Sequence, residues 1–132
     1  MDTKTKKIAQ PDFFKRSVCP ITNALEIIGD KWTMIIIRDL FLGLKTYSEF
    51  QQSPENIPSN ILADRLKKLE AGGIIDKIPY QDRPVRYEYH LSKQGKGLSK
   101  VLKAMKHWGL EFIPGTSAKM AEQLLKKGKK IR

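Results

Sequence analysis

The feature that most constrains the fold is a change in the spacing of apolar residues at Gly72-Gly73. Before these glycines, leucines at positions 62, 66 and 69 recur every three or four residues, which predicts a helix over residues 59–71. After them, residues 74–78 form a short apolar run and residues 86–91 alternate between apolar and polar side chains, which predicts two strands. The polar segment between the strands, residues 79–85, contains two prolines and is the expected hairpin tip. A helix followed directly by a hairpin is therefore the central unit of this chain.

A short helix with its own start signal precedes this unit. Thr46 and Glu49 have the spacing of a capping box, in which each residue satisfies a backbone N–H group of the other, and they predict a short helix through Gln51. Residues 53–58 are rich in turn-forming side chains and separate this helix from the one over residues 59–71. A short helix, a turn, a longer helix and a two-stranded hairpin form, in this order, a winged helix-turn-helix. Its longer helix is the candidate recognition helix.

Two more helices are expected nearer the N-terminus. Pro20 suits the first position of a helix, with Cys19 at or beside the N-cap, and Gly29 ends that helix. Asp30 is a good N-cap for a second helix over residues 31–42, whose side chains are apolar on nearly every side. A helix of this kind belongs at the centre of a core.

The predicted architecture is an α+β fold, mainly α: a winged helix-turn-helix with a two-stranded wing and terminal dimerisation helices. We expect a basic arm at residues 1–16, one folded domain over residues 17–113, and a short helix with a lysine-rich tail at residues 114–132. The end of the domain, about residues 92–113, is predicted as one long amphipathic helix. Its apolar face exceeds what a single chain of this size can cover, so we expect a homodimer. The residues expected in the dimer interface are Leu98, Val101, Leu102, Met105, Trp108 and Phe112.

The opposite face of this long helix carries a basic stripe. Its members are Lys93, Lys96, Lys100, Lys103 and His107. A basic amphipathic helix can lie on a membrane surface. The lysines can also simply face water, and we favour this second interpretation, with no membrane partner.

The formal net charge of +11 indicates a polyanionic partner. Much of this charge lies in residues 1–16 and 119–132, so the charge alone does not distinguish nucleic-acid binding from solubility. Together with the predicted fold, it favours a transcriptional regulator that binds double-stranded DNA sequence-specifically. The alternatives are a winged-helix module that binds another protein and a membrane-surface protein.

Two groups of residues are candidates for DNA contact. On the helix over residues 59–71, the side opposite the leucines is polar, and its asparagine can bond both N6 and N7 of adenine. Two arginines flank the hairpin tip, from which they can reach a minor groove or its phosphates. The candidate DNA-binding residues are Ser59, Asn60, Ala63, Asp64, Lys67, Arg83 and Arg86. The alternative for each is a side chain that faces only water.

The sequence lacks the residue patterns of catalysis and metal binding. It has no Ser/His/Asp grouping at motif spacing and no glycine-rich phosphate loop. His90 and His107, with one cysteine, do not supply the four or so clustered ligands that zinc requires. We therefore expect no enzymatic activity and no cofactor. The first residues have no apolar segment behind their charges, and no apolar run could span a bilayer, so we expect a reduced, cytoplasmic protein.

Several segments resemble the HxlR-type regulators. They are CPI at 19–21, ALEIIGDKWT at 24–33, IIRDL at 36–40, LADRLKKLEAGGII at 62–75, PVRYEY at 84–89 and LSKQG at 91–95. GDKWT together with PVRYEY is the specific part of a resemblance that spans roughly residues 17–113. The resemblance implies a dimeric bacterial repressor or activator that binds inverted-repeat promoter sites, with the long helix helping to form the dimer.

Cys19 has two interpretations. At a helix N-terminus, three residues after Arg16, its sulfur lies near unpaired N–H groups and a positive charge, which lower the pKa of the thiol and increase its reactivity. Some members of the resembling family sense electrophiles or oxidants through a cysteine at this position, which implies a small electrophile or oxidant as effector. The alternative is a packed, inert thiol. As the chain's one cysteine, Cys19 can form a disulfide only with another subunit or a small thiol.

Overall fold

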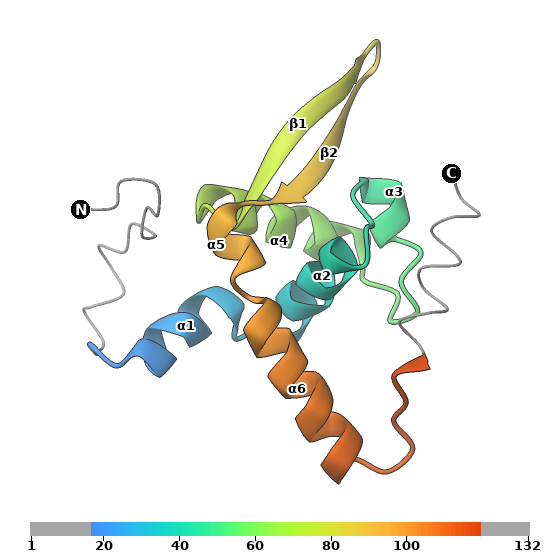
Figure 1. The fold of residues 1–132 in the computed structure, drawn as a ribbon. Coiled ribbons are helices and arrows are strands. Elements are labelled where there is room, and N and C mark those ends of the chain that lie inside the picture. The colour runs from blue at the N-terminus through green and yellow to red at the C-terminus, as the bar shows by residue number, and fades with distance from the viewer. Residues whose placement is uncertain (1–16, 120–132) are drawn as a thin grey trace.

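The computed structural model describes residues 17–119, which form helices around a central helix and one two-stranded hairpin (Figure 1). The elements are α1 (Pro20–Ile28), α2 (Lys31–Phe41), α3 (Tyr47–Phe50), α4 (Ser59–Ala71), β1 (Ile75–Asp82), β2 (Val85–Leu91), α5 (Lys93–Lys96) and α6 (Ser99–Phe112). The mainly helical winged helix-turn-helix expected from the sequence is confirmed. The arm predicted at residues 1–16 and the part of the predicted tail beyond residue 119 lie outside the described residues.

Local signals in the sequence set the ends of α2 and α3. Asp30 caps α2, because its carboxylate accepts a hydrogen bond from the backbone N–H of Thr33 at 3.0 Å. Thr46 and Glu49 form the predicted capping box at the start of α3. Gly43 follows α2 with a φ of +97°, a left-handed conformation that glycine adopts without strain. The residues between α2 and α3 therefore determine where the first helix ends, before Gly43, and where the second begins, after Thr46.

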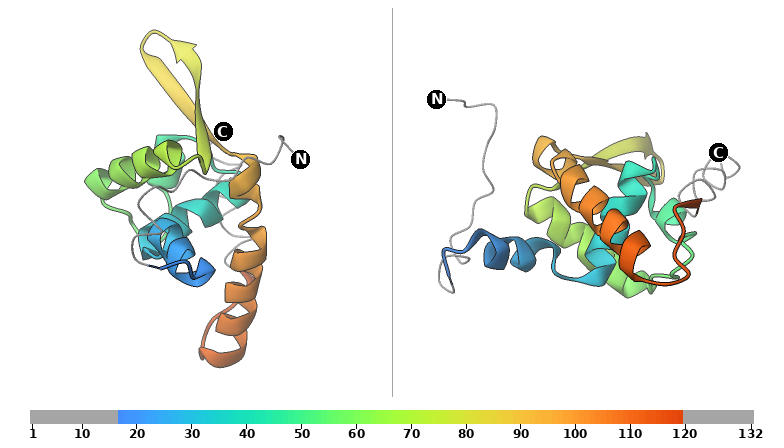
Figure 2. Two further views of the ribbon diagram at one scale, coloured as in Figure 1. Left: turned by 90° about the vertical axis from the view of Figure 1, so that its left-hand side faces the viewer. Right: turned by 60° about the horizontal axis from the view of Figure 1, so that its bottom comes forward.

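α2 lies at the centre of the core, as its apolar sequence predicts (Figures 1 and 2). Ile36 and Ile37 of this helix are fully buried. Phe50 of α3, Leu62 of α4 and Ile75 of β1 are buried in the same cluster. The core therefore joins α2 to both helices of the helix-turn-helix and to the base of the hairpin.

A polar cluster, Arg38, Asp39, Ser53 and Glu55, crosses the edge of this core. The carboxylate of Asp39 is completely buried and accepts hydrogen bonds from the Ser53 hydroxyl and from the Arg38 guanidinium, the latter at 2.9 Å. Arg38 also donates to both carboxylate oxygens of Glu55, at 2.7 and 2.8 Å. This Asp39 cluster ties α2 to the turn between α3 and α4.

The hairpin is longer than the sequence predicts. β1 and β2 pair antiparallel as far as Asp82 and Val85. Residues 79–82, which were expected in the tip, belong to β1, and only Arg83 and Pro84 lie in the turn. The outer part of the hairpin is exposed, so no alternation of apolar and polar side chains marks where its strands end.

The single long helix expected over residues 92–113 is in fact two helices, α5 and α6. Ser92 caps α5 by accepting a hydrogen bond from the backbone N–H of Gly95 at 3.1 Å, and α5 ends at Gly97. Gly95 packs so closely that a Cβ atom there would lie 2.3 Å from the carbonyl oxygen of Ile74. Glycine is also a poor helix former, which favours the interruption. The basic stripe expected along one helix is consequently divided between two.

The hairpin and α6 project from opposite ends of the molecule (Figures 1 and 2). α4 lies at the base of the hairpin, whereas α1 extends to the side at the end where α6 projects. None of the described helices is long and apolar enough to cross a membrane. The fold thus separates the hairpin and α4 at one end from α1 and α6 at the other.

Candidate nucleic-acid interface

One face of α4 packs against the core, and the opposite face is exposed to solvent. Leu62, Leu66 and Leu69 are buried in the core, as their spacing predicts. At the start of the helix, the hydroxyl of Tyr47 on α3 donates a hydrogen bond to the backbone carbonyl of Ser59 at 2.8 Å and pairs with the Ser59 hydroxyl at 2.9 Å. α3 therefore fixes the N-terminal end of α4, which is the end that usually enters the groove in helix-turn-helix proteins.

The outward face of α4 carries the five residues of this helix that were predicted to contact DNA. Ser59, Asn60, Ala63 and Lys67 are exposed, and Asp64 is half-buried. Asn60 offers a donor and an acceptor that match the major-groove edge of adenine, and Lys67 offers a positive charge. The face is thus accessible and chemically suited to a base pair and a phosphate.

The two arginines of the hairpin lie at its tip, as predicted. Arg83 is in the turn, and both Arg83 and Arg86 are exposed. The amide of Gln81 donates a hydrogen bond to the carbonyl of Pro84 at 3.1 Å, which ties the two sides of the tip together. The guanidinium groups are therefore carried at the outer end of a hydrogen-bonded hairpin.

A groove of about 450 Å³ separates α3 from the hairpin. It is lined by Thr46, Tyr47, Ser48, Gln51, Tyr80, Val85, Arg86, Tyr87 and Tyr89. Its hydroxyl, amide and guanidinium groups are donors of the kind that bind phosphate oxygens. The groove therefore brings polar side chains at α3 close to Arg86 of the hairpin.

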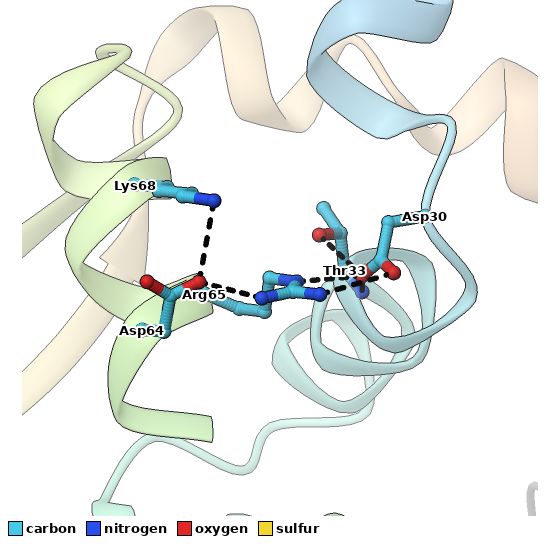
Figure 3. A network of polar contacts seen from close by, with 5 residues as sticks. All are labelled: Asp30, Thr33, Asp64, Arg65 and Lys68. Carbon is cyan, nitrogen blue, oxygen red and sulfur yellow. Dashed lines mark hydrogen bonds and ion pairs between the residues drawn. The ribbon is translucent and has the colours of Figure 1, made fainter. Parts of the chain in front are cut away.

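Arg65 and Tyr47 have contacts that were not predicted from the sequence. Arg65 donates from Nη1 to the Asp64 carboxylate at 2.5 Å and from Nε to the Asp30 carboxylate, at the start of α2, at 2.8 Å (Figure 3). Lys68 approaches the same Asp64 oxygen at 3.4 Å. Asp64, predicted as a DNA contact, is thus paired within the protein. The capping box places Tyr47 at the start of a helix, but no local pattern indicates the partner of Arg65.

Cys19 occupies the N-cap of α1 and is half-buried, outside the core cluster. The nearby backbone N–H and hydroxyl of Thr22, and the backbone N–H of Ile21, lower the pKa of the thiol. These are the unpaired helix-terminal groups that the sequence predicts at this position. Arg16 lies outside the described residues. The groups at the start of α1 therefore favour the thiolate form of Cys19.

The six residues predicted for the dimer interface fall into two groups, one packed against the chain's own core and one exposed to solvent. Leu98 and Leu102 are partly buried against the chain's own core. Met105, Trp108 and Phe112 have 53%, 60% and 60% of their surface exposed, and Val101 is also exposed. The exposed part of the predicted set, from Val101 to Phe112, therefore forms an apolar strip along α6.

The two histidines lie on different elements, His90 on β2 and His107 on α6. Within residues 17–119, no three His, Cys, Asp or Glu side chains are placed to hold a metal ion together. His90 instead pairs through Nε2 with the Glu88 carboxylate at 3.0 Å. His90 is thus paired with a residue of its own strand, β2.

The sequence matches the HxlR-like helix-turn-helix family over residues 27–127. An uncharacterised HTH-type transcriptional regulator of Mycobacterium bovis is 33% identical over 94 residues, which are 71% of this chain and 59% of that protein. This chain therefore spans less than two thirds of the length of that relative.

Two solved structures agree with this assignment. The redox regulator HypR in its reduced form is 32% identical, with a TM-score of 0.65, over 70% of this chain and 92% of that one. The reduced transcriptional regulator YodB from Bacillus subtilis is 30% identical, with a TM-score of 0.62, over 76% of this chain and 99% of that one. Because the family model covers most of the sequence and agrees with the observed fold, the chain belongs to the HxlR-like helix-turn-helix family.

Proposed function

We propose that this protein is a homodimeric, sequence-specific regulator of transcription that binds double-stranded DNA and catalyses no reaction. α4 enters the major groove as the recognition helix, and the hairpin contacts the flanking backbone or the minor groove. The operator is an inverted repeat, because a two-fold symmetric dimer presents two identical recognition helices. Repression or activation then follows from the position of the operator relative to the promoter.

The observation that carries this proposal is that one face of α4 is fixed to the rest of the fold while the opposite face is exposed. Buried leucines and the hydroxyl of Tyr47 hold the helix, while Asn60 and Lys67 remain exposed on its outward face. Arg83 and Arg86 extend the same kind of polar surface along the hairpin. The transcriptional regulators among the relatives give independent support.

Selection of bound duplexes from a random DNA pool tests this function. We expect enrichment of one inverted repeat whose half-sites lie about one helical turn, roughly 34 Å, apart. Binding should weaken steeply as salt rises, because phosphate contacts release counterions. Recovery of no preferred sequence, together with salt-insensitive binding to a protein, would instead establish the alternative of a winged-helix protein-interaction module.

Substitutions on α4 and the hairpin should weaken DNA binding in different ways. Arg83→Ala and Arg86→Ala should each reduce the slope of log K against log[salt] by about 1, because each removes one phosphate contact. Asn60→Ala should instead lose roughly 1–3 kcal/mol of discrimination at one base-pair position. Fluorescence anisotropy with the selected duplex and its single-base variants measures both effects. Wild-type binding by all three folded variants would exclude this surface as the DNA interface.

We propose a small electrophile or oxidant as the effector, acting at Cys19. The lowered pKa of this thiol increases its thiolate fraction, and thiolates are the form that oxidants attack. Mild oxidation should therefore change the operator affinity of the wild type and leave that of Cys19→Ser unchanged. The measurement is anisotropy before and after peroxide or a disulfide oxidant, with reversal by a thiol reductant. An equal response of both proteins would show that Cys19 is not a switch.

A further inference from the structure

Arg65 uses all three of its guanidinium nitrogens on carboxylates of its own chain. Nε donates to Asp30 Oδ2 at 2.8 Å, Nη2 approaches Asp30 Oδ1 at 3.3 Å, and Nη1 donates to Asp64 Oδ2 at 2.5 Å (Figure 3). Only 24% of its side-chain surface is exposed. A guanidinium that is occupied in this way has few donors left for a phosphate, although it lies on the proposed recognition helix.

Asp30 is a rigid partner because it also caps α2. Its Oδ2 atom accepts hydrogen bonds from the backbone N–H of Thr33 at 3.0 Å and from the Thr33 hydroxyl at 3.1 Å. The hydrogen bond from Arg65 lowers the pKa of Asp30 to about 2, so the carboxylate is charged at neutral pH. The ion pair therefore links the middle of α4 to the first turn of the central helix.

Asp64 lies on the outward face of α4, between residues proposed to contact DNA. An unpaired carboxylate at this position would repel the phosphates of a bound duplex, because like charges repel most strongly where water is excluded. Here the carboxylate is held between Arg65 and Lys68, which approaches it at 3.4 Å. Hydrogen bonding to Arg65 lowers the pKa of Asp64 as well, so this pairing maintains its charge and balances it.

We propose that Arg65 is a positioning residue for DNA binding: it fixes α4 against Asp30 and neutralises Asp64 on the recognition surface, without touching DNA itself. This inference rests on the proposed DNA-binding function. A positioning role differs from direct DNA contact because Arg65 then acts only through the side chains of Asp30 and Asp64. Removing one of them should therefore compensate for loss of the arginine.

The test is a double-mutant cycle on the operator duplex recovered by selection. Arg65→Gln should bind it about tenfold more weakly. Asp64→Asn alone should stay within about threefold of the wild type, because its charge is already balanced. Asp64→Asn combined with Arg65→Gln should restore binding to within about threefold of the wild type. Thermal melting of each variant gives the folded fraction for which the affinities are corrected.

Asp30→Asn tests the other end of the network, since asparagine retains the ability to cap α2. We expect its operator affinity to fall about threefold while α2 remains capped. Wild-type affinity of Asp30→Asn would overturn the part of the proposal that involves Asp30. Unchanged affinity of Arg65→Gln would overturn the whole.

Two further results would also contradict the proposal. A salt slope reduced by about 1 in Arg65→Gln, with no rescue by Asp64→Asn, would identify a direct phosphate contact. Affinity losses that disappear after correction for the folded fraction would identify a purely structural arginine. If the wild type selects no sequence, the proposed function itself fails. This outcome is distinguishable because it precedes any comparison of variants.

Discussion

Replacing Arg38 with methionine should lower the free energy of unfolding by about 3 kcal/mol, because it leaves the buried carboxylate of Asp39 without its cationic partner. Methionine retains much of the apolar stem of arginine, so the loss reports mainly on the charge. Glu55 loses the same partner, but it is partly exposed and can be hydrated. Urea unfolding followed by circular dichroism measures the change.

The loss should also depend on pH. Burial raises the pKa of Asp39, and the hydrogen bond from Ser53 and the charge of Arg38 oppose this increase. Without Arg38 the pKa of Asp39 rises further, so the folded state retains a proton that the unfolded state has released. Stability then falls as the pH rises from the ordinary aspartate pKa through the raised one. The deficit of Arg38→Met should therefore be smaller at about pH 5 than at about pH 8.

Two controls identify the cause of this loss. Asp39→Asn in the Arg38→Met background removes the unpaired charge and keeps an oxygen for the Ser53 hydroxyl, so it should recover part of the stability. Arg83→Met removes an exposed arginine and should change stability by less than about 0.5 kcal/mol. Wild-type stability of Arg38→Met at both pH values would show that the Asp39 cluster does not support the fold.

The elements that could be predicted from the sequence are those with local signals. α4 has the predicted bounds, because its leucines recur with helical period and two glycines follow its last residue. The start of α3 follows from the capping box of Thr46 and Glu49. In both cases residues a few positions apart along the chain determine the structure.

The elements that were missed depend on contacts between distant residues. The interruption between α5 and α6 involves Gly95 packed against the carbonyl of Ile74, a contact that hydrophobic spacing does not contain. The ladder of the hairpin continues through exposed residues because backbone groups, not apolar side chains, form its hydrogen bonds. Arg65 and Asp30 are 35 positions apart, so no short motif indicates their pairing. For the same reason the exposed candidates on α4 were easier to predict than the residues that hold them.

An apolar surface at the end of the molecule opposite the hairpin remains exposed in the single chain. On α1, Ile21 and Leu25 have 70% and 58% of their surface exposed. On α6, Trp108 and Phe112 are each 60% exposed, and their rings are in tilted contact with centroids 5.5 Å apart. A groove of about 540 Å³ lies between α1, α2 and α6, with Leu25 and Met105 among its lining residues. Exposed apolar surface of this kind is typical of an interaction site, and we propose that a second copy of the chain covers it in a two-fold symmetric dimer.

Trp108→Glu should therefore dissociate the proposed dimer. It replaces a large apolar side chain with a carboxylate in each protomer, and a central aromatic residue commonly contributes most to such an interface. We expect the dimer dissociation constant to rise by about a hundredfold or more. Light scattering over a range of concentrations measures this constant. Operator affinity should fall steeply as well, because a monomer engages one half-site, and the variant should bind a single half-site as well as it binds the full inverted repeat.

Lys103→Gln is the matched control. Like Trp108→Glu, it changes the net charge of the chain by −1, but it does so on the face of α6 opposite the apolar strip. It should remain dimeric and bind the full operator with affinity close to that of the wild type, since an isolated exposed lysine contributes little to stability. If Trp108→Glu stays dimeric, the apolar strip of α6 is not the dimer interface. If it becomes monomeric and still prefers the full inverted repeat over a half-site, operator recognition does not depend on dimerisation. The proposal predicts that Trp108→Glu loses both dimerisation and the preference for the full inverted repeat. Loss of both together supports a dimer in which this surface sets the distance between the two recognition helices.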